Sequence, residues 1–219
     1  MNLFSTNKSL SGISITCTSI RGLGVSIKEL ADKKINRILN LKADIHILID
    51  TRCSEAQFNH FLNTSKFKYM LSNFTHCGTY TKSKGIIVLY NKKKCKIYDV
   101  KLIQEGMLLS FNVTVQNEII KVLGCYAPSS EDEPEFFLDC KEILDNSVES
   151  HGLILGDLNT TLDPNLDRRY YKHDNHIKSR LVINSWIEAN EILDFYRLLN
   201  GNMQQWTGHS TPRKSTIKH

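Results

Sequence analysis

Acidic, amide and hydroxyl side chains follow apolar runs at four places in this sequence. Together with two arginines, they form the groups Ser19–Arg21, Asp50–Arg52, Tyr126 and Asp157–Asn159. Strand ends are rigid, and ligands bind in the loops that follow them. Carboxylates are hard oxygen ligands, and Mg²⁺ is usually held by one or two of them while water and substrate phosphate complete its shell. Asp50 and Asp157 are therefore candidate ligands for such an ion. An aspartate after a strand is also a common turn former or helix cap, so neither carboxylate alone decides the question.

Apolar periodicity predicts the elements that would position these side chains. Strands are expected at 13–18, 43–50, 68–73, 85–91, 95–103, 107–115, 119–127 and 152–159, and helices at 26–41, 54–65, 133–148 and 179–190, with a short element at 191–200. Ser26 is expected to cap the first helix, with Glu29 as its capping-box partner. Sparse helices among many strands indicate two packed sheets with helices outside.

Length and composition limit the class of protein. The chain has 219 residues, 41% of them hydrophobic and 23% charged, which excludes disorder throughout. No linker-like tract divides it, so one domain spanning 1–219 is expected. The net charge of +5 permits a nucleic-acid partner without requiring one.

The six cysteines have no zinc spacing and form no CxxC pair, which favours reduced thiols in an intracellular protein. Without a secretory signal or an apolar run of about 18 residues, no membrane partner is expected.

Seven short motifs occur in one order along nearly the whole chain. They are SIRGL (19–23), DIHILIDT (44–51), GIIVL (85–89), CYAP (125–128), LGDLN (155–159), ILDFYR (192–197) and QWT (205–207). In type and order they resemble the motifs of the exonuclease–endonuclease–phosphatase superfamily. Within it, the chain is most similar to the apurinic-endonuclease-like domain of LINE-type non-LTR retrotransposon polyproteins.

The resemblance implies a four-layer α/β sandwich that cleaves phosphodiester bonds in DNA with Mg²⁺, or Mn²⁺ as an alternative. It assigns metal binding to Asp50, activation of the attacking water to Asp157, and phosphate contacts to Asn159 and Tyr126. Ser19 and Arg21 would line the site. A retrotransposon origin would imply a larger polyprotein containing a reverse transcriptase, and action in the nucleus.

The chain departs from the family pattern at three places. Ser19 replaces an asparagine, and Asp50 replaces a glutamate that is one methylene longer. The family's closing Asp-Tyr and Ser-Asp-His motifs have no match before His219, a solvated end residue in this interpretation. We therefore expect a domain that is truncated at its C-terminus, lacks its last strands, and is weakly active or inactive alone.

Basic residues in two loops are candidates for DNA contacts. Arg168, Arg169 and Lys172 follow Asn159 in sequence and are interleaved with tyrosines, which suits backbone contacts and base stacking. A solvated charged loop explains them equally well. The lysines at 92–94 are better explained as an edge that blocks strand pairing. The histidines at 173, 176 and 209 are expected at the surface.

Two other functions stay open. One is a phosphatase or sphingomyelinase-like phosphodiesterase of the same superfamily, acting on a small molecule or lipid. The other is a nucleic-acid-binding remnant without catalysis, which the Ser19 substitution and the missing closing motifs support.

Overall fold

A computed structural model describes residues 12–64, 73–115, 117–148, 151–167, 176–189 and 191–201. The strands are β1 (Ile15–Ser19), β2 (Ile45–Ile49), β3 (Phe74–Thr79), β4 (Ile86–Asn91), β5 (Ile97–Gln104), β6 (Leu108–Val115), β7 (Glu118–Tyr126) and β8 (His151–Asp157). The helices are α1 (Lys28–Leu39), α2 (Glu55–Thr64), α3 (Pro134–Asp145), α4 (Pro164–Asp167), α5 (Ile177–Glu188) and α6 (Phe195–Asn200).

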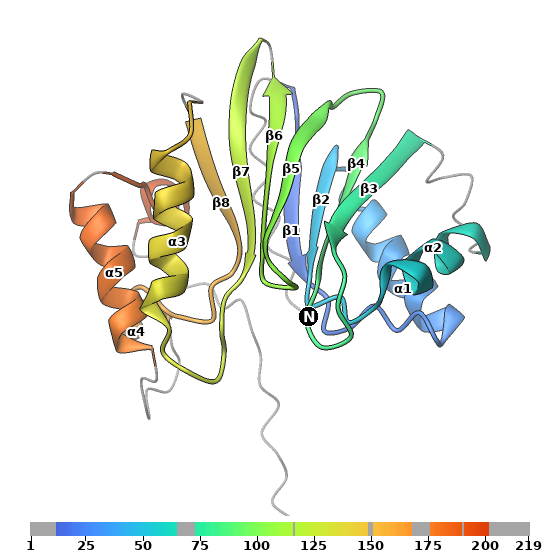
Figure 1. The fold of residues 1–219 in the computed structure, drawn as a ribbon, viewed down its shortest axis with the longest axis horizontal. Helices are drawn as coiled ribbons and strands as arrows, with labels where there is room; N and C mark the ends of the chain where they lie inside the picture. The colour runs from blue at the N-terminus through green and yellow to red at the C-terminus, as the bar shows by residue number, and fades with distance from the viewer. Residues whose placement is uncertain are drawn as a thin grey trace, which may run out of the picture.

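The strands form two four-stranded sheets, in the orders β1-β2-β4-β3 and β5-β6-β7-β8. Each sheet contains one parallel pair, β1 with β2 and β7 with β8, and its other pairs are antiparallel. Figure 1 shows the strands in the middle, with α1 and α2 on one side and α3, α4 and α5 on the other. The predicted α/β sandwich of two mixed sheets flanked by helices is confirmed.

Alternation along the strands separates the apolar side chains into three layers. In β2, the isoleucines at 45, 47 and 49 enter the core between the sheets, whereas Leu48 packs against the outer helices. Across the interface, Phe111 and Val122 of the second sheet complete the inner core. A third cluster joins the outer face of that sheet to α3 and α5. Each fully buried side chain of this size contributes about 1.5–3 kcal/mol relative to exposure, so both sheets are held firmly.

Most of the predicted elements lie within two residues of their expected bounds, but β3 was missed. The strand at 68–73 was predicted instead, and residues 68–72 lie outside the described residues. The sequence of β3, FTHCGT, is half-buried and contains a glycine, so its hydrophobic pattern is weak. Pairing with β4 determines it.

The predicted capping box at the start of α1 is wrong. A turn closed by the bond from the Ile27 N–H to the Gly24 carbonyl makes Ile27 the N-cap, and no side chain caps this helix. Ser26 therefore lies one residue too early. A reciprocal capping box is present at α2, where Ser54 and Gln57 each accept a hydrogen bond from the other's backbone N–H.

All six cysteines are free thiols, as their spacing predicts. Among the described residues, no helix combines the length and the apolar character that crossing a membrane would need.

Candidate active site

The carboxyl ends of β1, β2, β7 and β8 meet at one edge of the sandwich. Ser19 pairs with Ile49, the residue before Asp50, and Tyr126 pairs with Asp157. Across the two sheets, β8 contacts both β1 and β2. Tyr126 packs against the inner core, as do Leu153 and Leu155 of β8, so alternation places Asp157 on the same face of its strand.

Strained backbone marks the same edge. Among the described residues, seven non-glycine residues have positive φ, and four of them follow β1, β2 or β8 directly. These are Arg21 (47°), Asp50 (57°), Arg52 (50°) and Asn159 (48°). Left-handed conformations of non-glycine residues cost about 1–3 kcal/mol each and concentrate at functional sites. The strain indicates that the chain is shaped here to aim side chains.

Neighbouring loops fix the backbone on both sides of Asp50. The Gly22 N–H donates to the Asp50 carbonyl at 2.6 Å, and the Arg52 N–H donates to the Lys84 carbonyl at 2.7 Å. Asp50 itself is only 3% exposed. The regular alternation of β2 therefore stops at Ile49, and the position of Asp50 is set by three separate segments.

The side chain of Lys34 ties α1 to the loop after β1. Its ammonium donates to the Ile20 carbonyl at 2.9 Å and also to the Gly22 carbonyl. Partial burial lowers the pKa of Lys34, while the nearby carboxylate of Asp50 opposes this shift. Lys34 thus positions the loop that carries Arg21, which is exposed. Sequence reasoning missed Lys34 because the periodicity of the helix shows only its apolar face.

Arg52 holds both carboxylate oxygens of Asp50. Its Nε lies 2.8 Å from Oδ1, and its Nη2 lies 2.8 Å from Oδ2. The Asp50 side chain is 4% exposed, whereas that of Arg52 is 51% exposed. Hydrogen bonding to Asp50, followed by the charge of that carboxylate, raises the pKa of Arg52. The sequence placed Arg52 among the polar residues that follow the second strand, but it gave Arg52 no role in the site.

Asp157 and Asn159 are tied to the end of β7. The Asn159 amide nitrogen donates to the Ala127 carbonyl at 2.6 Å, and the Asn159 N–H donates to Asp157 Oδ1 at 3.2 Å. The Ala127 N–H in turn donates to the Asp157 carbonyl at 2.9 Å. A Cβ at Gly156 would clash with the Cys125 carbonyl oxygen, so only glycine allows β8 to approach β7 this closely.

The charges of both carboxylates act on Tyr126. Burial raises the pKa of its hydroxyl, and the charges of Asp50 and Asp157 raise it further, whereas Arg52 lowers it. A single phenol therefore lies within electrostatic reach of acids that are far apart in sequence. Its raised pKa keeps Tyr126 protonated at neutral pH, so it can donate a hydrogen bond to an anion.

The donor types at this edge fit a hard divalent cation. The described residues include no group of three or more His, Cys, Asp or Glu side chains that could hold a metal alone. Mg²⁺ does not require such a group, because one or two carboxylates with water and phosphate are its usual ligands. Asp50 already pairs with a cationic guanidinium, which shows that this position accommodates positive charge.

Of the two basic loops, the structure describes only the one with the lysines at 92–94. Arg168, Arg169 and Lys172 are outside the described residues. Ile86, at the start of β4, pairs with Ile49 and so lies near the site. Residues 92–94 follow Asn91 at the other end of β4, roughly 17 Å from Ile86 along the strand. Lys94 there pairs with Asp44 at 2.8 Å.

The predicted surface position of His176 is wrong. The residue is buried at the start of α5, next to the helix N-terminus that Asp132 caps. The histidines at 173 and 209 lie outside the described residues.

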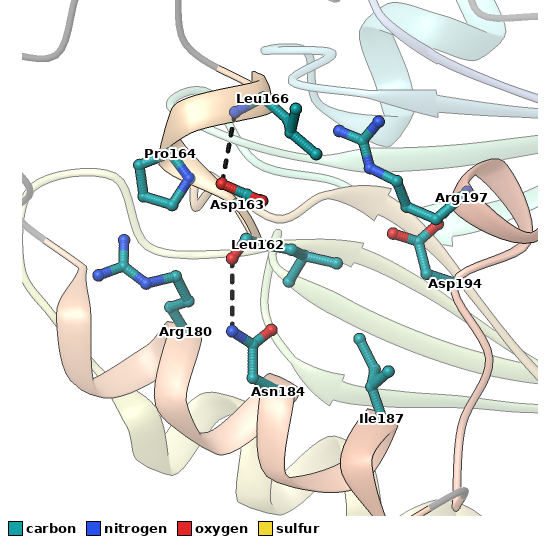
Figure 2. Close-up of a pocket in the computed structure, with 9 residues that line it drawn as sticks. All are labelled: Leu162, Asp163, Pro164, Leu166, Arg180, Asn184, Ile187, Asp194 and Arg197. Carbon is teal, nitrogen blue, oxygen red and sulfur yellow. Dashed lines mark hydrogen bonds between the residues drawn. The ribbon is translucent and has the colours of Figure 1, made fainter. Parts of the chain in front are cut away.

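A separate pocket of about 690 Å³ lies between α4, α5 and α6. Figure 2 shows its lining, which includes the Asp194 and Arg197 of the ILDFYR motif. Its polar groups serve local structure: Asp194 caps α6 through the Arg197 N–H, and Asn184 donates to the Leu162 carbonyl. The pocket contains neither Asp50 nor Asp157.

No protein-family model matches this chain. Several solved structures superpose on it. An AP endonuclease from Archaeoglobus fulgidus superposes with a TM-score of 0.66 and 16% identity over 93% of this chain and 80% of its own. An AP endonuclease from Leishmania major superposes with a TM-score of 0.62 and 16% identity, over 84% of this chain and 68% of its own. A 3′-5′ exonuclease from Neisseria meningitidis superposes with a TM-score of 0.56 and 15% identity, over 80% of this chain and 70% of its own. The chain therefore has the fold of these nucleases, which is the fold implied by its resemblance to the exonuclease–endonuclease–phosphatase superfamily.

Proposed function

We propose that this chain is a divalent-metal-dependent endonuclease that hydrolyses phosphodiester bonds in DNA, with Mg²⁺ as its preferred ion and Mn²⁺ as a substitute. The observation that carries the proposal is that the strands before Asp50 and Asp157 end at one edge of the sandwich, where the charges of both acids act on Tyr126. The fold shared with two AP endonucleases and an exonuclease supports DNA as the substrate.

The two acids take different roles because their surroundings differ. Asp50 is buried and its charge is already compensated by a cation, so it would hold the metal, which would supply charge stabilisation at the phosphate. Asp157 is half-buried and has one oxygen bonded to the Asn159 N–H. Its other oxygen orients the attacking water and accepts its proton.

Neutral donors at the same edge serve the phosphate. Tyr126 stays protonated and donates to a phosphate oxygen as negative charge develops there. The Asn159 amide uses one hydrogen on the Ala127 carbonyl, which leaves its second hydrogen for a phosphate oxygen. Ser19 and Arg21 line the site from the end of β1. We expect a low rate, since Ser19 has a shorter reach than the family's asparagine and Arg52 competes for Asp50.

The test is nicking of supercoiled plasmid under single-turnover conditions, with protein in excess over DNA. Asp157→Asn removes the base while keeping the side-chain shape, and about a 100-fold or greater loss of Mg²⁺-dependent nicking is expected. The matched control is Asp145→Asn, which removes an exposed acid on α3 that pairs with Lys141. Equal nicking by wild type and Asp157→Asn contradicts the proposal.

Assays of phosphoinositide hydrolysis and of DNA binding, run beside the nicking assay, separate the alternatives. Hydrolysis of a phosphoinositide with intact plasmid indicates the small-molecule or lipid phosphodiesterase. DNA binding that neither chelator nor Asp157→Asn affects, without any cleavage, indicates the non-catalytic remnant.

We also propose that the chain acts within a LINE-type retrotransposon polyprotein, nicking chromosomal DNA in the nucleus. Support comes from the order of its motifs, including ILDFYR at 192–197. The nucleotide sequence after codon 219 tests this: an in-frame reverse transcriptase supports it, and an unrelated reading frame contradicts it. The DNA contacts assigned to Arg168, Arg169 and Lys172 belong to the same proposal. Replacing all three with alanine should weaken binding and flatten its salt dependence.

A further inference from the structure

The ion pair between Asp50 and Arg52 occupies the position where the proposed metal would bind. Both Asp50 oxygens accept a hydrogen bond from the guanidinium at 2.8 Å, so Arg52 takes the side of the carboxylate on which one ion would bind both oxygens. A two-pronged pair of this kind is the strongest geometry that arginine and carboxylate form.

The backbone is shaped to make this pair. Residues two apart in a strand share a face at a separation of nearly 7 Å, which does not produce a fork-to-fork contact. Here Asp50 and Arg52 both adopt left-handed conformations, and the Arg52 N–H is held by the Lys84 carbonyl. The strained backbone at these two residues therefore accompanies the contact between the guanidinium and the carboxylate.

We propose that Arg52 is a displaceable cation: it neutralises Asp50 before a metal binds, and on metal binding it moves to the substrate phosphate. This inference rests on the proposed function, because it assumes that Asp50 holds the metal. A divalent ion that chelates both oxygens needs the same side of the carboxylate as the guanidinium, so metal binding in that mode breaks at least one of the two hydrogen bonds.

The guanidinium has a second partner close by. Arg52 is half exposed, and it interacts with Tyr126 as well as with Asp50. Tyr126 also lies within reach of the Asp157 charge, where the phosphate is expected. A planar arginine fork binds phosphate oxygens as readily as carboxylate oxygens. Release from Asp50 therefore leaves Arg52 beside the substrate.

Metal affinity provides the test, without any need for turnover. Arg52→Ala removes the competitor, and its Mn²⁺ dissociation constant, measured by calorimetry, should be about tenfold lower than that of wild type, equivalent to about 1.4 kcal/mol. The control Arg37→Ala removes the same charge from the exposed side of α1 and should leave the affinity unchanged. Equal or weaker Mn²⁺ binding by Arg52→Ala overturns the inference.

Two further variants keep the outcomes distinct. Arg52→Lys retains the positive charge but cannot bond both Asp50 oxygens in the same way, so its Mn²⁺ affinity should fall between those of wild type and Arg52→Ala. This graded result would not be expected if Arg52→Ala merely disturbed folding. Asp50→Asn should abolish Mn²⁺ binding. If Asp50→Asn binds Mn²⁺ like wild type, the proposed function loses its metal site. If Asp50 matters but Arg52 does not, only the present inference fails.

The movement to phosphate is tested by coupling between two ligands. With Ca²⁺ as a probe for the metal, wild type should bind duplex DNA more tightly when Ca²⁺ is present, because Arg52 is then released. In Arg52→Ala this enhancement should fall at least threefold, since the released group is missing. An undiminished enhancement contradicts the transfer of Arg52 to the substrate.

Discussion

The buried pair of Thr16 and His46 should make the protein less stable in mild acid. His46 lies on β2, four residues before Asp50, with its Nδ1 2.8 Å from the Thr16 hydroxyl and its Nε2 buried without a partner. Burial lowers the pKa of His46 from 6.5 to about 4. In the unfolded chain the same imidazole takes up a proton near its ordinary pKa, so between these values the unfolded state binds more protons.

The sign and size of the effect follow from this difference. Because the unfolded state is the more protonated one, the free energy of unfolding falls as the pH drops from about 6.5 towards about 4. With each pKa unit worth 1.36 kcal/mol, the loss between about pH 7 and about pH 5 is about 2 kcal/mol. The pKa of His76 is also lowered by burial and acts in the same direction, so the wild-type protein alone cannot isolate His46.

A double substitution isolates it. Thr16→Val with His46→Leu removes both polar partners together, which leaves neither one unsatisfied. Urea unfolding at about pH 7 and about pH 5 then gives the pH-dependent loss for each protein. The variant should lose about 2 kcal/mol less than wild type over this interval. The same pH-dependent loss in both proteins refutes the reasoning.

Two further substitutions test the cap at the start of α5 and the close approach of β8 to β7. Asp132→Ala removes a carboxylate that accepts two backbone N–H bonds at the start of α5 and a third from the Ser179 hydroxyl. It should cost about 1–2 kcal/mol in thermal unfolding, and a loss of only a few tenths contradicts the capping role. Gly156→Ala places a Cβ against the Cys125 carbonyl and should destabilise the protein by about 3 kcal/mol or more, whereas Gly152→Ala on the same strand meets only a flexible leucine side chain and should cost less. Equal effects of the two alanines in chemical denaturation contradict the close approach of β7 and β8.

The sequence predicts the strands that carry the site better than it predicts the contacts within the site. The isoleucines at 45, 47 and 49 alternate strictly, so the strand and its end at Asp50 can be located without a structure. The pairing of Asp50 with Arg52 depends on left-handed backbone at both residues. Loops distant in sequence impose that conformation, and a local pattern cannot reveal it.

Other misses have the same cause. Ser26 and Glu29 have the spacing of a capping box, but a turn at Gly24 moves the start of the helix beyond Ser26. His176 lies in a polar stretch, yet the packing of α5 buries it. In each case a tertiary contact overrides a local preference.

Localised cleavage of the polypeptide by bound iron tests the central claim most directly. Fe²⁺ substituted for Mg²⁺, with ascorbate and peroxide, cuts backbone near the metal, and mass spectrometry locates the cuts. If Asp157 lies beside the metal that Asp50 holds, cuts should appear around both residues, disappear with excess Mg²⁺, and be lost at both places in Asp50→Asn. Cuts near only one of the two, or elsewhere in the chain, contradict the account.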